Sequence, residues 1–138
     1  MKLTPRIENW IESFGVHIAI SDDKGQIIII VAEKTSVDGD VVTIDLSENQ
    51  SNQIEEVLSK NDCVALAPGQ LGAIRAPYQL KGCARLVNGY LEVEISEIYC
   101  TKPGPEAGIR LDVLGYYGMK HFDESRWTDL APVNPSYS

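Results

Sequence analysis

Residues 97–112 of the chain read EIYCTKPGPEAGIRLD, and they determine where its most regular β-segment must end. Pro103 and Pro105 fix their own φ angles and lack backbone N–H donors, so a hydrogen-bonded ladder cannot continue through them. Gly104 lies between them and allows a bend that a Cβ would resist. We therefore predict that a strand reaching Cys100 leaves its sheet here, and that a stiff turn sets the start of the C-terminal segment.

The segment before this exit has the pattern of a long β-hairpin, with strands over residues 78–87 and 90–100. The dipeptide Asn88-Gly89 separates them, and it tolerates the positive φ angles of a two-residue type I′ turn. In the second strand Leu91, Val93 and Ile95 alternate with polar residues. This alternation indicates one buried face and one face in water.

The remaining elements follow from their periodicity. Thr4-Pro5 predicts the start of a helix, and Gly15 predicts its end. A second helix is expected over residues 47–60, with strands over 16–21, 26–33, 41–46 and 63–67 and a loop or irregular edge over 70–77. The strand over 26–33 is apolar on both faces, which predicts a central or covered strand. Together the pattern predicts a mainly β fold, a six-stranded antiparallel barrel with helices at its ends. We expect a barrel domain over residues 1–114 and a C-terminal tail over 115–138 that packs on the barrel or on a partner subunit.

Composition excludes several classes of function. The chain has 138 residues, the size of one domain, and a net charge of −8 that disfavours nucleic acid and anionic membrane surfaces as partners. Its longest apolar run, residues 27–32, is too short to span a bilayer. The first five residues contain no signal-peptide pattern. These features predict a cytoplasmic protein.

The three cysteines, Cys63, Cys83 and Cys100, are widely spaced and form no Cys-x-x-Cys pair. In a reducing compartment they are expected to be small buried hydrophobic residues. A metal site would need distant residues to converge, so we predict none. No Ser/His/Asp set, carboxylate pair or glycine-rich phosphate loop is evident, so no catalytic residue is assigned.

Four blocks of the chain resemble the FMN-binding split-barrel proteins of the pyridoxamine 5′-phosphate oxidase family, and in particular its small stand-alone members. These blocks are residues 14–25, 57–66, 78–87 and 97–112, of which the last, with its Pro-Gly-Pro-x-Ala-Gly-x-Arg-Leu pattern, is the most specific. The resemblance implies a six-stranded split β-barrel, a homodimer, and FMN bound in a groove between the subunits.

The resemblance also implies where FMN would bind. The family holds the phosphate at the start of the helix after the third strand, and the corresponding residues here are Asn49, Gln50, Ser51, Asn52 and Gln53. Residues 47–56 contain three glutamates and no Lys or Arg, so the phosphate would be held by neutral donors and the helix N-terminus. The alternative is an ordinary polar helix cap.

Four further residues are candidate flavin contacts. Lys34 and Thr35 are the cation and the hydroxyl at the end of the apolar second strand, where the alternative is a solvated strand end. Arg75 can supply positive charge from another direction, or it is a surface arginine. Trp127 can stack on the flavin ring across a dimer, or it anchors the tail on the barrel.

These features lead to two hypotheses of different classes. The first is an FMN-binding protein that acts as a flavin-dependent oxidoreductase or electron carrier on a small molecule. The second is a flavin-less split-barrel homologue that serves as a binding or scaffold subunit. Oxidation of pyridoxamine 5′-phosphate itself is not expected, because the sequence has no basic cluster for a second phosphate.

Overall fold

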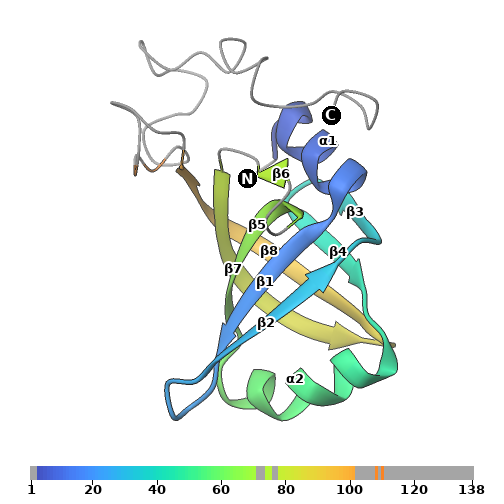
Figure 1. Cartoon of the computed structure of the whole chain (residues 1–138), viewed down its shortest axis with the longest axis vertical. Helices are drawn as coiled ribbons and strands as arrows, with labels where there is room; N and C mark the ends of the chain where they lie inside the picture. Colours follow the sequence, from blue (N-terminus) through green and yellow to red (C-terminus); the bar gives the residue numbers. More distant parts are fainter. Residues whose placement is uncertain (1–2, 71–73, 76–77, 102–107, 109, 111–138) are drawn as a thin grey trace.

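The computed structural model describes residues 3–70, 74–75, 78–101, 108 and 110. Within them the chain forms two helices and eight strands (Figure 1). In chain order the elements are α1 (Pro5–Phe14), β1 (Val16–Ser21), β2 (Ile27–Ala32), β3 (Thr35–Asp38), β4 (Val41–Asp45), α2 (Glu48–Lys60), β5 (Cys63–Gln70), β6 (Ile74–Arg75), β7 (Tyr78–Val87) and β8 (Tyr90–Cys100).

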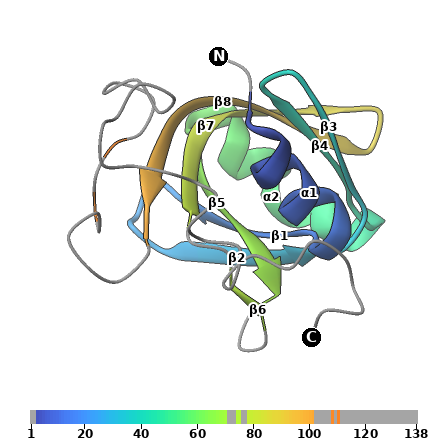
Figure 2. The same cartoon turned by 90° about the horizontal axis from the view of Figure 1, so that it is seen from above.

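The strands form one curled antiparallel sheet in the order β2-β1-β5-β7-β8-β4-β3, and the short β6 pairs with β5. Seen from above, the sheet curves around the two helices as a half-barrel (Figure 2). The mainly β prediction is confirmed, but the prediction of six strands was too low. The pattern missed β3 because it has four residues and runs directly into the turn at Gly39, and it missed β6 because a two-residue strand has no periodicity.

The helices lie at opposite ends of the barrel, as predicted (Figure 1). Helix α1 begins after Thr4, whose hydroxyl accepts a hydrogen bond from the Ile7 N–H at 3.2 Å. It ends at Gly15, whose N–H donates to the Ile11 carbonyl at 2.8 Å and whose φ of +76° lies in the left-handed region. Helix α2 begins with a capping box, in which Ser47 and Gln50 each accept a hydrogen bond from the other's backbone N–H.

The core fills the concave side of the sheet between the helices. Alternate strand residues point inward, as in β1, where Val16, Ile18 and Ile20 are fully buried. Trp10 of α1 and Ile54 of α2 close the two ends of this core. The other face of the sheet points outward, and we call it the outer face.

The predicted β7–β8 hairpin is confirmed, with positive φ angles at Asn88 (52°) and Gly89 (84°). Strand β8 ends at Cys100, as predicted from the two prolines, although the prolines lie outside the described residues. The Gly108 N–H donates to the Cys100 carbonyl at 2.8 Å, and Arg110 forms a β-bridge with Tyr99. The chain therefore turns back against the end of β8. The tail over residues 115–138 lies outside the described residues.

Strand β2 corrects a second prediction. Its apolar sequence predicted a strand that is central or covered on both faces, and the first alternative is wrong, because β2 stands at the end of the strand order and pairs with β1. Its inward residues, Ile30 and Ala32, are buried, whereas its outward residues are exposed. Apolar residues on both faces thus mark a strand whose outer face has no cover in the described chain.

Candidate functional site

A cleft of about 480 Å³ opens on the outer face of the sheet, and we call it the outer-face cleft. Strands β1, β2, β5, β7 and β8 all contribute to its wall. The small residues Ala19, Ala65 and Gly82 form part of it, and they leave the room that larger side chains would fill. Lys81 and Glu97 add charged groups. This volume lies within the range of about 300–1,000 Å³ that is typical of small-molecule sites.

An irregularity in the β7–β8 pair shapes one side of the cleft. The register shifts between Lys81 and Gly82, so that Ser96 of β8 has no direct partner. The Ser96 hydroxyl instead donates to the Lys81 carbonyl at 3.3 Å. A Cβ at Gly82 would lie 2.1 Å from the Glu94 carbonyl oxygen, so the close approach of the two strands requires glycine there. Bulges of this kind redirect side chains beside binding sites.

Three aliphatic side chains extend from the cleft along the outer face of β2. We call Ile27, Ile29 and Val31 the β2 stripe, and they are 68%, 58% and 43% exposed. Ile27 lines the outer-face cleft, so the stripe and the cleft form one continuous apolar surface. A contiguous exposed patch of this kind marks a site for a ligand or for another protein.

The far end of the β2 stripe contacts Gln50, one of the residues predicted to hold a phosphate. The Gln50 side-chain amide donates to the Val31 carbonyl at 3.3 Å, and the Asp45 N–H donates to the Lys34 carbonyl at 3.0 Å. These bonds bring the loop after β2 to the first turn of α2. We call Lys34, Thr35, Asn49 and Gln50 the Lys34 corner. Residues 47–56 contain no cation, and the lysine of the neighbouring loop, Lys34, lines a recess together with Thr35 and Asp45.

Two members of the Lys34 corner already have structural partners. The Thr35 hydroxyl donates to the Ile11 carbonyl at 2.6 Å, which ties β3 to the end of α1. Gln50 completes the capping box with Ser47. Lys34 and Asn49 are exposed and remain at the surface.

The other predicted site residues do not join this corner. Asn52 and Gln53 face a separate recess of about 300 Å³ beside the β1–β2 turn, with Asp23 and Lys60. Ser51, half-buried in the first turns of α2, lines neither this recess nor the outer-face cleft. Arg75 is placed in β6, beside the end of β5. Trp127 lies outside the described residues. Whether any of these residues contacts a flavin stays a prediction.

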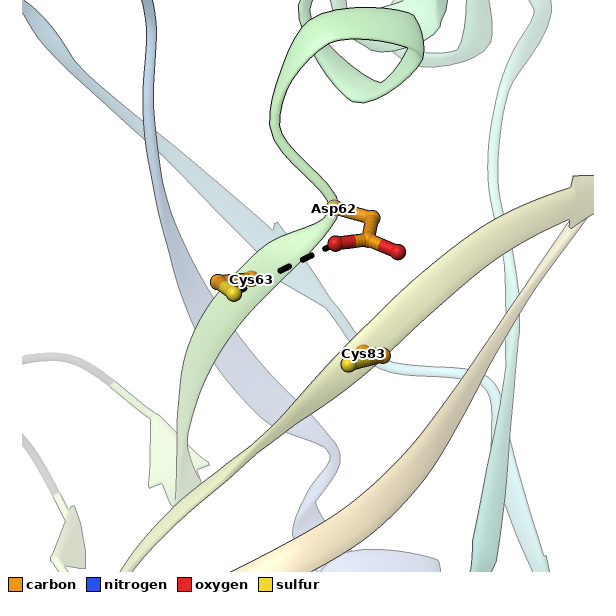
Figure 3. Close-up of side chains that lie close together, drawn as sticks. All are labelled: Asp62, Cys63 and Cys83. Atoms are coloured by element: carbon orange, nitrogen blue, oxygen red, sulfur yellow. Dashed lines mark hydrogen bonds between the residues drawn. The ribbon is translucent and has the colours of Figure 1, made fainter.

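The cysteines contradict the expectation that all three are buried. Cys100 is buried, but Cys63 and Cys83 are exposed on the outer face. They are direct partners across β5 and β7, and the Asp62 carboxylate lies beside them (Figure 3). Partial desolvation and the negative charge of Asp62 raise the pKa of the Cys83 thiol above its ordinary value. Sequence spacing could not reveal this cluster, because only the pairing of two separate strands creates it.

No helix in the described part of the chain has both the length and the apolar character needed to cross a membrane.

No protein-family model matches the chain, and no curated protein matches it. Solved structures do match its fold. HupZ of group A Streptococcus superposes with a TM-score of 0.57 at 15% identity, over 77% of this chain and 99% of that one. A candidate pyridoxamine 5′-phosphate oxidase of Lactobacillus delbrueckii does so with a TM-score of 0.57 at 16% identity, over 72% of this chain and 94% of that one. The chain therefore has the split-barrel fold of these two proteins, as the resemblance in its sequence predicted.

Proposed function

We propose that this chain is a cytoplasmic homodimer that binds FMN without a covalent bond and acts as a flavin-dependent oxidoreductase or electron carrier on a small molecule. One observation carries the proposal. The apolar β2 stripe joins the outer-face cleft at Ile27 to the Lys34 corner at Val31, and the fold is that of a candidate pyridoxamine 5′-phosphate oxidase.

This surface suits the two chemically different ends of FMN. Val31 lies four positions after Ile27, a span of about 13 Å along a strand, which an extended FMN can bridge. The flat isoalloxazine ring would lie on the aliphatic stripe and in the cleft. The phosphate would lie at the Lys34 corner, beside the Lys34 ammonium and the N-terminus of α2, whose capping box already pairs the Ser47 and Gln50 N–H groups.

The corner has acidic as well as basic neighbours. Asp45 lines the same recess as Lys34, so its carboxylate would oppose a bound phosphate. Lys34 supplies a single positive charge, and Asn49 adds a neutral amide. Glu48 lies in the same first turn and opposes the phosphate charge. We therefore expect moderate FMN affinity that depends strongly on Lys34.

A second copy of the chain is the proposed cover for the β2 stripe. The exposed aliphatic side chains lie on the strand at one end of the sheet, where no further described strand covers them. A symmetric contact would bury both stripes together and enclose the flavin between subunits. Enclosure matters because it excludes water from the ring.

The flavin, when bound, supplies the electron or hydride transfer. The chain's own residues have the supporting tasks of holding the phosphate, fixing the ring plane and keeping water away. The Lys81 ammonium lies 4.9 Å from the centre of the Tyr99 ring and lines the cleft, so it can place positive charge near the bound ring.

The test is a titration of the purified full chain with FMN and with riboflavin, followed by visible absorption and by quenching of flavin fluorescence. Wild-type protein should bind FMN more tightly than riboflavin. The variant Lys34→Gln should weaken FMN binding by about 10- to 100-fold, the effect of losing one charge-assisted hydrogen bond, and leave riboflavin binding unchanged.

Lys24→Gln is the matched control, because Lys24 is an exposed lysine in the β1–β2 turn, outside the Lys34 corner. Its FMN affinity should equal that of wild type. Failure of wild-type protein to bind either flavin at micromolar concentration would refute the proposal, and an equal loss in both lysine variants would refute the role of the Lys34 corner.

The second candidate function, a flavin-less binding or scaffold subunit, is favoured by two observations. Gln50 is engaged in helix capping, and residues 47–56 contain no cation. Under this alternative the outer face would bind a protein partner in place of FMN. A colourless protein that is dimeric and binds neither FMN nor riboflavin would support this alternative.

A further inference from the structure

We propose that Asp62, Cys63 and Cys83 form a binding site for a thiophilic divalent metal ion such as Zn²⁺, at the border of the outer-face cleft. We call these three residues the thiol cluster. One ligand atom from each, two sulfurs and one carboxylate oxygen, lies within 4.8 Å of the others. The proposed metal site does not require bound flavin, although its two cysteines line the cleft in which the flavin ring would lie.

The backbone brings the two sulfurs to the same place. The Ala84 N–H donates to the Asp62 carbonyl at 2.8 Å, so residues 62 and 84 form a hydrogen-bonded pair. Their neighbours Cys63 and Cys83 then form a non-hydrogen-bonded pair. In such pairs the Cα atoms are only about 4.5 Å apart, and the side chains are closer than elsewhere in an antiparallel sheet.

Both sulfurs also lie on the same side of the sheet. Their neighbours Val64 and Ala84 are buried in the core, and side-chain alternation places Cys63 and Cys83 on the outer face. Both are exposed and both line the outer-face cleft. A metal ion can therefore reach them without any opening of the barrel.

Asp62 supplies the third ligand. It immediately precedes β5, and one of its carboxylate oxygens lies 4.0 Å from the Cys63 sulfur (Figure 3). The ordinary alternation of a strand would send adjacent side chains to opposite faces. At this strand end the carboxylate instead lies beside both thiols, and Figure 3 shows the three side chains gathered where β5 and β7 run next to each other.

The distances are close to those of a bound ion. Ligands at ordinary Zn–S and Zn–O distances in a tetrahedron lie about 3.5–3.8 Å from one another. The thiol cluster needs to contract by roughly 1 Å, which rotation of exposed side chains can provide. Two thiolates and one carboxylate carry three negative charges, so the site with a bound divalent ion has a net charge of −1.

Three protein ligands leave one tetrahedral position open, as in catalytic zinc sites. Because the two cysteines line the outer-face cleft, water or a small ligand in the cleft can take that position. The donor set favours zinc-like ions over Mg²⁺ or Ca²⁺, which prefer oxygen ligands.

The experiment is a Co²⁺ titration of the full chain, flavin-free and kept reduced with a thiol-free phosphine, followed by displacement with Zn²⁺. Wild-type protein should develop thiolate-to-cobalt charge-transfer bands and tetrahedral d–d bands at one ion per chain, and Zn²⁺ should abolish them. Cys63→Ala and Cys83→Ala should each weaken binding by at least about 100-fold, as expected for loss of a direct ligand. Asp62→Asn should weaken binding and change the d–d bands.

Two controls separate ligation from other effects. Glu94 is an exposed residue of β8 that pairs with Cys83 but is not part of the thiol cluster, so Glu94→Gln removes a nearby carboxylate that is not a proposed ligand. Cys100→Ala removes the third thiol, which is buried. Both should retain the cobalt bands. If Cys100→Ala fails to fold, alkylation mass spectrometry of wild type gives the same answer, because Zn²⁺ should protect Cys63 and Cys83.

Absence of charge-transfer bands in reduced wild-type protein would overturn the proposal, and so would bands that survive in Cys63→Ala or Cys83→Ala. The cobalt titration uses flavin-free protein, so its outcome does not depend on whether the chain binds FMN.

Discussion

Replacement of Ile29 by aspartate tests the proposed dimer, on which the enclosure of the flavin depends. Ile29 is the central residue of the β2 stripe, and its side chain is 58% exposed. Because it points away from the core, the substitution should leave the folding of each subunit almost unchanged. Its effect should instead appear in the association of two copies.

The expected loss of dimer stability follows from how much of the β2 stripe is exposed in one subunit. Its three side chains are 68%, 58% and 43% exposed, which together equal about 1.7 fully exposed aliphatic side chains per subunit. At about 1.5–3 kcal/mol for each fully buried side chain, a symmetric contact gains about 5–10 kcal/mol from this stripe. The share of Ile29 in both subunits is about 2–3.5 kcal/mol, so aspartate should raise the dimer dissociation constant at least about 30-fold.

Sedimentation equilibrium over a concentration series measures that constant directly. Gln79→Glu is the matched control, because it adds the same charge at an exposed position of β7, three strands away from β2 in the sheet. It should dimerise as wild type does. A wild-type protein that stays monomeric at tens of micromolar, or an Ile29→Asp variant with an unchanged dissociation constant, would refute the reasoning.

Three further substitutions test the structure that positions the site, each measured as the free energy of unfolding in urea. Gly82→Ala should cost about 1–3 kcal/mol or more, because its Cβ would meet the Glu94 carbonyl at 2.1 Å; an unchanged midpoint would contradict the close approach of β7 and β8. Thr35→Val should cost about 0.5–1.5 kcal/mol, because it deletes the 2.6 Å hydrogen bond to the Ile11 carbonyl; a loss below the measurement error would argue against that bond. Ile54→Ala should cost about 2–5 kcal/mol, since Ile54 is fully buried at the end of the core; wild-type stability would mean that α2 does not close the barrel.

Much of the fold was predictable from local chemistry. Thr4-Pro5 and Gly15 marked both ends of α1, and Asn88-Gly89 marked the hairpin, because caps and turns depend on a few neighbouring residues. The order of the strands in the sheet was harder to predict from the sequence. The sequence of β2 shows apolar residues on both faces, but periodicity cannot distinguish a central strand from an end strand whose outer face is uncovered.

The candidate site likewise depends on contacts between distant segments that sequence periodicity does not reveal. Residues 47–56 contain no cation, and only the hydrogen bonds between Asp45 and Lys34 and between Gln50 and Val31 reveal that the segment with Lys34 meets the start of α2. The thiol cluster was missed because Cys63 and Cys83 are twenty positions apart in the chain. A prediction that paired the strand at residues 63–67 with the strand at 78–87 would have placed these cysteines side by side.

The most direct test of the central claim is an amide chemical-shift map of the ¹⁵N-labelled chain during FMN addition. We predict that the signals of Ile29, Val31 and Lys34 shift together with those of Ala19 and Ala65 in the cleft, because the flavin would lie along the whole surface from the Lys34 corner to the cleft. Shifts confined to the recess around Asp23, Asn52 and Lys60, or no shifts at millimolar FMN, would contradict the account.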